Sequence, residues 1–310
     1  MRVAVTGAGG RLGRALMAAL ADAPFTGLSG PMGWSRADID LDDATPERIG
    51  RLLDRDRPEV VVHAAAWTDV DGCARDPELA QRRNGEATGV LAQELAQRGL
   101  DLVAISTNEV FDGRRVDGRG YAPSDATGPL NPYGASKLAG EELARQAYTG
   151  AGAPALEPYE RHEGVPDAPQ LAIVRTAWLF GPHGPNFVST MLRLAAERDE
   201  VQVVTDQVGS PTFAGHLAPA LVDMAERTDT GIFHGAGSGS CSWYELTLEA
   251  YDAAGVACRV LPTTAEQFAR PAPRPAYSVL GSEREHPITL PPWQEGVRAH
   301  LAALEEVPSR

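Results

Sequence analysis

The sequence predicts an α/β protein built on a doubly wound parallel sheet, with a smaller, discontinuous second domain. Two patterns predict this class. In the first half of the chain, short β-rich runs alternate with helical patterns, and a glycine-rich turn separates the first run from the first helix. In the second half, proline and glycine interrupt shorter elements. A chain of 310 residues, of which 43% are hydrophobic, is long enough for a full core and a second domain.

The predicted elements follow one another in a regular alternation. In chain order they are the strand Val3–Thr6, a helix from about Arg11, the strand Val60–His63, the helical stretch Glu78–Gln97, the strand Leu102–Ser106, a helix from near Tyr133, and the strands Leu171–Thr176 and Gly231–Gly235. This number of units suits a complete dinucleotide-binding domain of the Rossmann type.

The glycine turn after the first strand predicts the cofactor. Gly7, Gly10 and Gly13 have the spacing G-x-x-G-x-x-G, with Arg11 and Leu12 between the last two glycines. Gly7 permits a tight turn, Gly10 lets the backbone approach a pyrophosphate, and Gly13 allows the helix to pack closely on the strand. Because the helix N-terminus then faces the phosphates, the turn predicts a bound dinucleotide.

The residues after the second strand indicate which nicotinamide cofactor is favoured. Ser35 and Arg36 supply a hydroxyl and a guanidinium, which suit the 2′-phosphate of NADP, whereas an acid there would hold the 2′-hydroxyl of NAD. We therefore expect NADP(H) to be preferred, with NAD(H) as the alternative. The competing interpretation is that Arg36 is a solvated loop residue. Asp40 and Leu41 are expected to flank the adenine.

Two further stretches are expected beside the cofactor. Ala64, Ala65 and Ala66 follow the third strand, and their small side chains let the strand end lie against a ligand. Asn84 lies inside a helical stretch although its helix propensity is poor. Either Asn84 contacts the cofactor or it is an exposed helix residue.

The chain divides into two predicted domains. We expect an NAD(P)-binding domain of residues 1–181 and about 202–237, and a substrate-binding domain of about 182–201 and 238–310. The segment Tyr148–Gln170 is rich in Pro, Gly and acidic residues and lacks a period, which predicts a surface loop. Three interpretations of this loop stay open: an insertion without function, a lid over the site, or a contact between subunits of an oligomer.

Charge and composition exclude several classes of partner. A net charge of −14 argues against nucleic acid and anionic membranes, because both attract clustered Lys and Arg. Cys73, Cys241 and Cys258 lie far apart without a CxxC pattern, so neither a disulfide framework nor a zinc site is predicted. The sequence has no signal-peptide pattern and no apolar run of about 18 residues, so we expect a cytoplasmic protein.

One pair of residues is suited to proton chemistry. Tyr133 and Lys137 lie four residues apart at the start of a helix, which places them on one face. Lys137 is the only lysine among 28 basic residues. A cation there is expected to lower the pKa of Tyr133 toward working pH and make the phenol a usable acid or base. Thr107, after the fourth strand, is expected either to bind a substrate carbonyl or to cap a turn.

With these pieces placed, the chain resembles the extended short-chain dehydrogenase/reductase family and, within it, the dTDP-4-dehydrorhamnose reductases. The resemblance covers nearly the whole length. It is carried by the segments GAGGRLG, VVHAAAWTDVDGCARDP, QRRNGEA, STNEVFDG, NPYGASKLAGE, VRTAWLFGPHGPNFVSTML, DQVGSPT, RPAYSVL and LPPW.

This resemblance implies an NAD(P)H-dependent oxidoreductase of dTDP-rhamnose biosynthesis. Such a sugar-nucleotide 4-ketoreductase transfers a hydride to C4 of dTDP-4-dehydro-L-rhamnose while Tyr133 protonates the developing alkoxide, giving dTDP-L-rhamnose. Lys137 is then implied to tune Tyr133 and bind the nicotinamide ribose, and Thr107 to polarise the ketone. Trp178 matches a substrate-contacting tryptophan. Further substrate-binding candidates are Asn108, Asn186 and Arg274.

The chain departs from the family pattern in two places. The reductases usually read STDYVFDG, where this chain has Asn108 and Glu109. The related dTDP-glucose 4,6-dehydratases read STDE and use the acid pair for elimination, so the missing Asp disfavours dehydration and leaves Glu109 without a role. Ala15 replaces a glutamate that some of these reductases use for a magnesium-linked dimer. We therefore expect no metal, and either a monomer or a homodimer.

Two other functions stay open. The first is a reductase that acts on another 4-keto-6-deoxy sugar nucleotide. The second is a non-catalytic regulatory subunit that binds NADP, similar to the beta subunit of methionine adenosyltransferase. The presence of Thr107, Tyr133 and Lys137 favours an enzyme.

Overall fold

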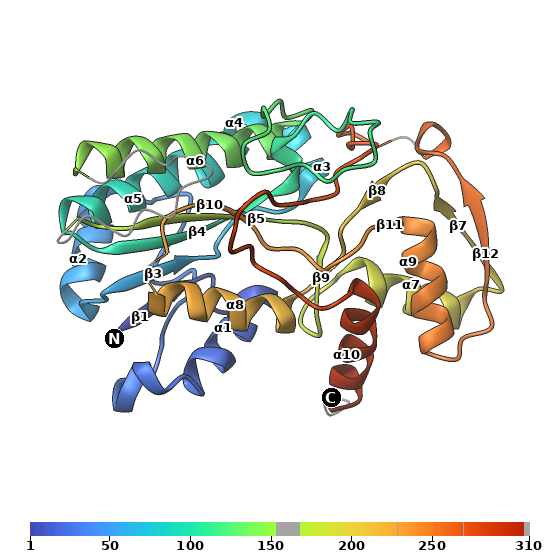
Figure 1. Cartoon of the computed structure of the whole chain (residues 1–310), viewed down its shortest axis with the longest axis horizontal. Coiled ribbons are helices and arrows are strands. Elements are labelled where there is room, and N and C mark those ends of the chain that lie inside the picture. Colours follow the sequence, from blue (N-terminus) through green and yellow to red (C-terminus); the bar gives the residue numbers. More distant parts are fainter. Residues whose placement is uncertain (153–167, 228, 269, 307–310) are drawn as a thin grey trace.

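Buried apolar runs form one six-stranded parallel sheet within residues 1–152, 168–227, 229–268 and 270–306, which the computed structural model of the chain describes. The fold class is therefore as predicted (Figure 1). Five of its strands are largely buried runs that contain valine or isoleucine, as expected for a parallel sheet with helices on each side, whereas the edge strand Met32–Trp34 is only partly buried. The strands are β1 Val3–Thr6, β2 Met32–Trp34, β3 Val60–His63, β4 Asp101–Thr107, β5 Leu171–Thr176 and β10 Gly231–His234.

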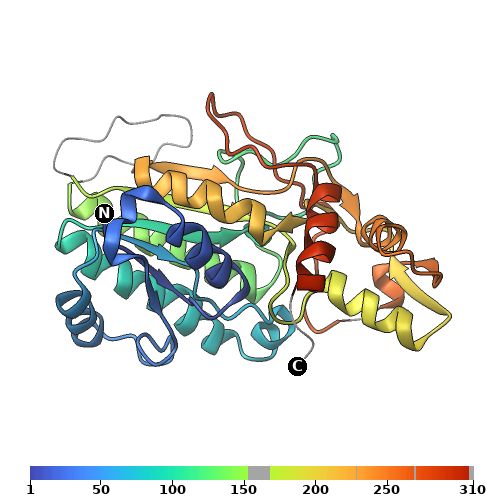
Figure 2. The same ribbon diagram turned by 90° about the horizontal axis from the view of Figure 1, so that it is seen from below.

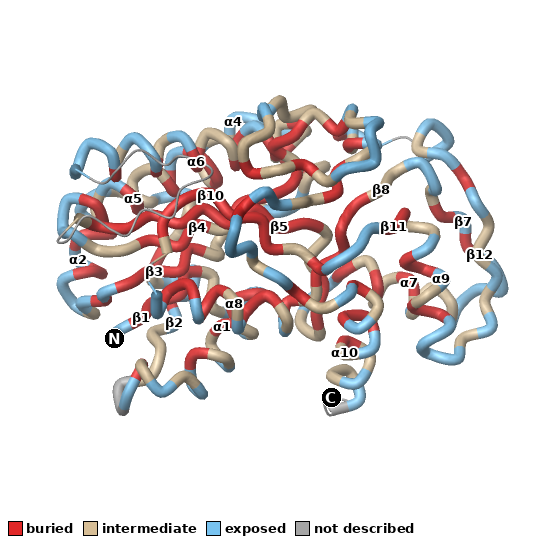
Figure 3. The backbone as a smooth tube through the Cα atoms, in the orientation of Figure 1, coloured by how far each residue is buried: buried red, intermediate tan, exposed pale blue. Residues whose placement is uncertain are grey.

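Helices cover the two faces of the sheet. On one face α1 (Arg11–Ala21) packs against α8 (Ala214–Arg227), and Leu16 and Leu221 are buried between them and the strands. On the other face lie α2 (Pro46–Asp56), α5 (Ala87–Gln97) and α6 (Pro132–Gly150). The burial pattern shows the sheet enclosed between these two layers (Figure 3).

The strand order fixes where ligands can bind. The sheet runs β10-β5-β4-β3-β1-β2, so the chain leaves β1 toward one side for β2 and returns to the other side for β3. In an open parallel sheet, such a reversal leaves a crevice outside the carboxyl ends of the strands. The residues after β1 and β3 therefore border the expected ligand site.

A smaller part lies beyond the carboxyl ends of the strands. Three short pairings hold it: β7 with β12, β8 with β11 and β6 with β9. Seen from below, α10 stands between the sheet layer and this part (Figure 2). The strands are β6 Leu179–Phe180, β7 Glu200–Val204, β8 Val208–Gly209, β9 Thr212–Phe213, β11 Cys241–Ser242 and β12 Arg259–Thr263. The helices are α7 Phe187–Glu197, α9 Trp243–Ala253 and α10 Trp293–Glu306.

Two predicted elements differ in detail. The stretch Glu78–Gln97 is one helical run, but a π-helical turn at Gln81–Glu86 joins α4 (Pro77–Ala80) to α5. Tyr148, predicted as the start of a loop, lies buried in the last turns of α6, and its hydroxyl donates to the Leu100 carbonyl at 2.7 Å. Residues 153–167 of the predicted loop, with its three alternative uses, lie outside the described residues.

Among the described residues, no helix is both long enough and apolar enough to cross a membrane.

Candidate active site

The carboxyl ends of the parallel strands bring most of the predicted residues together. Gly7 follows β1, Ala64 follows β3, Thr107 ends β4 and Trp178 lies two residues beyond β5. The ends of β1 and β3 also touch directly, because the Ala65 amide donates to the Thr6 hydroxyl at 3.1 Å. Residues far apart in the sequence thus share one edge of the sheet.

The glycine turn is shaped as the spacing predicts. Gly7 has φ +65°, in the left-handed region that favours glycine, and its carbonyl accepts from the Gly10 amide at 2.8 Å. A Cβ on Gly7 would lie 2.9 Å from Cα of Ala65, and a Cβ on Gly13 would overlap the Gly7 carbonyl oxygen. The turn exposes Gly9 and Gly10 at the N-terminus of α1, a geometry that fits a pyrophosphate.

Replacing Gly13 with alanine is expected to weaken cofactor binding by at least about tenfold and to cost about 1–3 kcal/mol of stability, because Cβ displaces the Gly7 carbonyl. Titration of protein fluorescence with NADPH and denaturant unfolding measure the two effects. Gly150→Ala, at the last position of α6 and away from the turn, is the control, since a Cβ there has no neighbour within 4 Å. Equal NADPH affinity in the two variants would contradict this account of the turn.

Two predicted ligand residues make structural contacts within the chain. The Arg11 guanidinium donates to the carbonyl of Leu179 at 3.2 Å and to that of Pro185, so it ties α1 to the smaller part. Asn186 caps α7: its Oδ1 accepts from the Ser189 amide at 2.9 Å, and its Nδ2 donates to the Ser189 hydroxyl at 2.9 Å. The cofactor contact predicted for Arg11 and the substrate contact predicted for Asn186 stay predictions.

The ribose-reading loop after β2 is more acidic in its contacts than predicted. Ser35 donates its hydroxyl to Asp38 at 3.0 Å, and Arg36 donates to Asp40 at 3.2 Å and to Asp42 at 3.0 Å. Leu41 is half-buried beside them. Both groups expected to receive a 2′-phosphate therefore already hold carboxylates.

Local sequence places the predicted catalytic pair, Tyr133 and Lys137, at the start of α6. Asn131 caps this helix by accepting from the Gly134 amide at 2.9 Å, and Pro132 takes the first helical position. Tyr133 is half-buried, while Lys137, one turn later, is 5% exposed. Thr107, at the end of β4, lies close enough to the Tyr133 phenol to lower its pKa, while its hydroxyl donates to Asn108 Oδ1 at 3.2 Å. The structure thus brings Thr107 and Tyr133 together as predicted.

The predicted effect of Lys137 on Tyr133 is wrong. Burial raises the pKa of Tyr133 above its ordinary value; the neighbouring Thr107 lowers it, and the charge of Glu109 raises it further. Lys137 is not among the groups that shift it. The phenol therefore keeps its proton at neutral pH, which is the state a proton donor needs.

Lys137 itself has an unusual environment. Burial lowers its pKa to about 8, against the opposing charge of Glu141. His63 lies on the buried side, with its ring nitrogens 2.8 Å from the Thr6 hydroxyl and 3.1 Å from the Thr88 hydroxyl. Burial lowers the pKa of His63 to about 3, so this imidazole is neutral. Lys137 therefore titrates close to physiological pH.

This titration predicts a pH profile. The kcat/KM for NADPH is expected to fall about tenfold per pH unit above pH 8, if Lys137 binds the ribose hydroxyls in its charged form as predicted. The unfolded chain keeps that proton up to about pH 10.5, so the contribution of Lys137 to the free energy of unfolding rises between about pH 8 and 10.5. Activity and stability measured together separate titration from unfolding, and a flat activity profile to pH 10 would rule this role out.

Asn84 is buried and acts as a bridge. Its Oδ1 accepts from the Trp67 amide at 2.8 Å, and its Nδ2 donates to the Trp67 carbonyl at 3.0 Å and the Ser136 hydroxyl at 3.1 Å. The π-helical turn places it there, and such turns recur at functional sites. Asn84 therefore positions the loop after β3 against α6, next to Lys137. The interpretation of an exposed helix residue is wrong.

The substrate side contains a strained aromatic residue. Trp178 has φ +42°, which is rare for a bulky side chain, and its ring stacks on Trp243 with centroids 3.5 Å apart. Trp243 was missed by the sequence reasoning. The only local signal, Ser242 and Glu245 around it, is a helix capping box.

Two polar candidates lie near Tyr133. The Arg274 guanidinium pairs with Asp71 at 3.0 Å and lowers the pKa of Glu109, although burial raises it more strongly. Glu109 accepts from Asn131 Nδ2 at 2.7 Å, directly before the catalytic helix. Asn108 is buried, and its Nδ2 has no hydrogen-bond partner among the described residues. Arg274 and Asn108 therefore remain candidates for contacts with the substrate.

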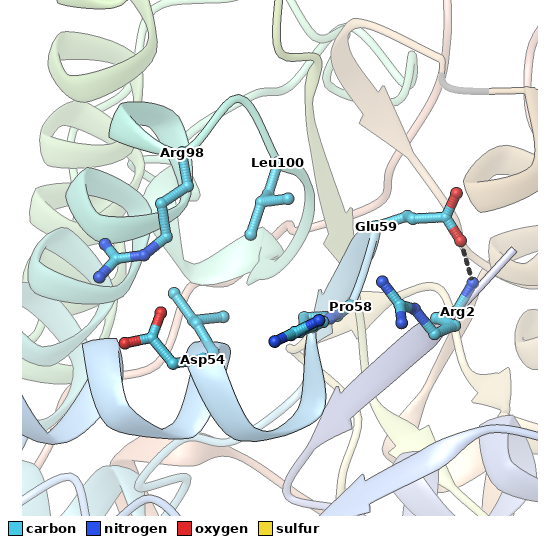
Figure 4. A pocket seen from close by; sticks show the side chains of 8 residues that line it. Arg2, Asp54, Pro58, Glu59, Arg98 and Leu100 are labelled. Atoms are coloured by element: carbon cyan, nitrogen blue, oxygen red, sulfur yellow. Dashed lines mark hydrogen bonds between the residues drawn. The ribbon is translucent and has the colours of Figure 1, made fainter.

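A separate cavity of about 390 Å³ lies at the opposite edge of the sheet (Figure 4). It is lined by residues that precede β1, β3 and β4, among them Arg2, Glu59 and Leu100. Its guanidinium and carboxylate groups alternate, and it holds none of the predicted site residues. Elsewhere in the described residues, no three His, Cys, Asp or Glu side chains gather closely enough to hold a metal ion.

Comparison with known proteins identifies the family. A family model described as RmlD substrate binding domain matches residues 1–306. The chain belongs to this family. Among its relatives, dTDP-4-dehydrorhamnose reductase of Streptomyces griseus is 38% identical over 311 residues, covering 97% of this chain and 93% of that protein. The dTDP-4-keto-6-deoxy-D-glucose reductase of Streptomyces niveus is 36% identical over 302 residues, covering 97% and 95%.

A solved structure agrees with this family membership. The crystal structure of dTDP-4-dehydrorhamnose reductase from Bacillus anthracis in complex with NADP has a TM-score of 0.83 and 32% identity, covering 97% of this chain and 99% of that one. The resemblance seen in the sequence is thereby confirmed.

Proposed function

We propose that this chain is an NADP(H)-dependent sugar-nucleotide 4-ketoreductase that converts dTDP-4-dehydro-L-rhamnose into dTDP-L-rhamnose. The observation that carries the proposal is the placement of Tyr133 beside Thr107, at the carboxyl edge of a sheet whose glycine turn fits a dinucleotide. Membership of the RmlD family and the names of the relatives support the substrate class. NAD(H) is the alternative cofactor.

The residues divide the reaction among themselves. NADPH, when bound at the turn of Gly7, Gly10 and Gly13, supplies the hydride for C4 of the sugar. Thr107 and Tyr133 bind the ketone oxygen, and Tyr133 gives it a proton as the hydride reaches carbon, so C=O becomes CH–OH and NADPH becomes NADP⁺.

The remaining residues bind and orient the two molecules. We assign Lys137, in its charged form, to the nicotinamide ribose hydroxyls. Trp178, with Trp243 stacked behind it, provides an aromatic face for the substrate, and Arg274 provides a cation near its diphosphate. Ala64 and its neighbours Ala65 and Ala66 lie against the cofactor.

A second candidate has a specific observation in its favour. Glu109, whose pKa is raised by burial, stands where the family usually has tyrosine, and the relative from Streptomyces niveus is named for another 4-keto-6-deoxy sugar. Reduction of dTDP-4-keto-6-deoxy-D-glucose uses the same proton donor. The third alternative, a regulatory subunit, predicts cofactor binding without turnover.

One assay separates these functions. Purified protein is offered dTDP-4-dehydrorhamnose or dTDP-4-keto-6-deoxy-D-glucose, each with NADPH and with NADH, and cofactor oxidation and the product sugar are followed. The proposal expects dTDP-L-rhamnose and a kcat/KM at least about tenfold higher for the first sugar, a difference of about 1.4 kcal/mol in transition-state binding. Preference for the second sugar selects the second candidate, and no turnover on either selects the subunit.

The division into domains is also a proposal. We assign residues 1–181 and about 202–237 to cofactor binding, and about 182–201 and 238–310 to substrate binding. The pairing of β7 with β12 supports moving the boundary in the middle of the chain past 204. We place the reaction in the cytoplasm because its nucleotide cofactor is found there, with the chain as a monomer or a homodimer.

A further inference from the structure

The loop after β2 is built from ion pairs that neutralise it. Arg36 is 75% exposed and is shared between Asp40 and Asp42, at 3.2 and 3.0 Å. The Asp42 amide in turn donates to the Asp40 carboxylate at 3.1 Å. Asp38 accepts from both the amide and the hydroxyl of Ser35 at 3.0 Å. Carboxylates thus occupy the donors that a 2′-phosphate would use.

A second arginine reaches this loop from the other side of the crevice. Arg83, on the π-helical turn, donates to Asp42 through Nε and NH2, both at 2.6 Å. It is only 23% exposed, and its guanidinium lies 5.1 Å from the centre of the Trp67 ring. Its neighbour Asn84 is fixed to Trp67 by two hydrogen bonds. Arg83 is therefore held in place, with Asp42 bound to it as a planar, two-point anion.

We propose that Asp42 is a specificity-determining residue for the cofactor: its carboxylate holds Arg36 and Arg83, the two guanidinium groups that a 2′-phosphate would otherwise attract. This inference rests on the proposed function, because it concerns how the same nicotinamide site chooses between NADPH and NADH. The acid that binds the ribose hydroxyls of NAD is expected directly at the end of β2, and Asp42 lies several residues beyond that point. The role of Asp42 is therefore inferred from its ion pairs and not from its position in the sequence.

Charge explains the expected effect. Asp40 and Asp42 carry two negative charges against the two positive charges of Arg36 and Arg83, so an incoming 2′-phosphate meets a nearly neutral group. The hydrogen bonds from Arg83 also hold the pKa of Asp42 below its ordinary value, so this carboxylate stays charged at working pH. The chain therefore gains little from the 2′-phosphate and accepts NADH as well.

The test is cofactor binding without any sugar. Dissociation constants for NADPH and NADH are measured by calorimetry for the unmodified chain and for Asp42→Asn. We expect the ratio of the NADH to the NADPH dissociation constant to rise about tenfold in Asp42→Asn, chiefly through tighter NADPH binding, because one negative charge is removed beside the phosphate. In the double variant Asp42→Asn, Arg36→Gln this gain should shrink, since one freed guanidinium is gone.

Asp43→Asn is the matched control. Asp43 is the next residue, is exposed, and pairs with Arg48 at 2.6 Å, so the variant makes the same change in net charge outside the cluster. Its cofactor ratio should stay within about twofold of the unmodified chain. Thermal melting of each variant checks that the fold is retained.

The outcomes are distinct. An unchanged ratio in folded Asp42→Asn, a parallel change of both constants, or an equal gain in Asp43→Asn overturns this inference and leaves the proposed function intact. If the double variant Asp42→Asn, Arg36→Gln binds NADPH as tightly as Asp42→Asn does, the role assigned to Arg36 is overturned. Failure of the unmodified chain to bind either cofactor overturns the proposed function and this inference together.

Discussion

Replacing Tyr133 with phenylalanine is expected to lower kcat about 10³-fold while the dissociation constant for NADPH changes less than about threefold. In the proposed mechanism the phenol gives its proton to the ketone oxygen, and burial raises its pKa, which favours the protonated form at neutral pH. The phenyl ring preserves the packing at the start of α6, so the loss concerns the reaction rather than the fold. Single-turnover kinetics and calorimetric NADPH binding measure the two quantities.

A second tyrosine provides the control. Tyr121 is buried, its hydroxyl donates to Asp112 at 2.6 Å, and burial raises its pKa as well, but it lies in a separate cluster with Phe111. Tyr121→Phe should therefore keep most of the turnover even if it costs stability. A Tyr133→Phe protein with more than about a tenth of normal kcat would show that another group supplies the proton.

Breaking the buried ion pair between Arg175 and Glu141 is expected to destabilise the chain by about 3–5 kcal/mol. Both side chains are 4% exposed, and NH2 of Arg175 lies 2.7 Å from Oε2 of Glu141. Arg175 also donates to the Pro123 carbonyl at 3.2 Å, and its guanidinium lies 5.1 Å from the centre of the Phe111 ring. Arg175→Met leaves a carboxylate buried without its partner, which is the source of the cost.

Denaturant unfolding measures this effect. The double variant Arg175→Met, Glu141→Leu should recover a large share of the loss, because it removes the unpaired charge. Arg193→Met is the control, since Arg193 forms an exposed pair with Glu197 at 3.0 Å and should cost less than about 1 kcal/mol. Similar losses in Arg175→Met and Arg193→Met would refute the importance of burial.

The ion pair also connects the fold to the site. The charge of Glu141 raises the pKa of Lys137, which lies one turn earlier on α6. In Glu141→Gln this support is lost, so the pKa of Lys137 should fall further and the high-pH limb of activity should begin at lower pH. Because Glu141 lies on α6 one turn after Lys137 and also pairs with Arg175, the same carboxylate affects both the stability of the fold and the pKa of Lys137.

The sequence predicted those features that depend on local pattern. Short valine-rich runs predicted strands such as β1, and the spacing of the glycines predicted the turn at Gly7. Both features are determined by residues that are neighbours in the sequence. The spacing of Tyr133 and Lys137 gave a shared helix face for the same reason.

The features that depend on distant contacts were not predictable. The pKa of Tyr133 is raised by burial and by the charge of Glu109, and no local pattern shows that burial, so the predicted effect of Lys137 was wrong. The sequence also did not show that the Arg11 and Asn186 side chains donate to the carbonyls of Leu179 and Gly181. The pair of Arg83 with Asp42 joins residues 41 positions apart, and no periodicity signals it.

The most direct test of the central claim follows the hydride. The two stereoisomers of NADPH deuterated at nicotinamide C4 are supplied separately with dTDP-4-dehydrorhamnose, and the product is analysed by NMR. We predict dTDP-L-rhamnose with one deuterium at C4 from one of the two isomers, and almost none with Tyr133→Phe. Sugar product without deuterium at C4 from either isomer, or cofactor binding with no sugar product, would contradict the assignment as a 4-ketoreductase.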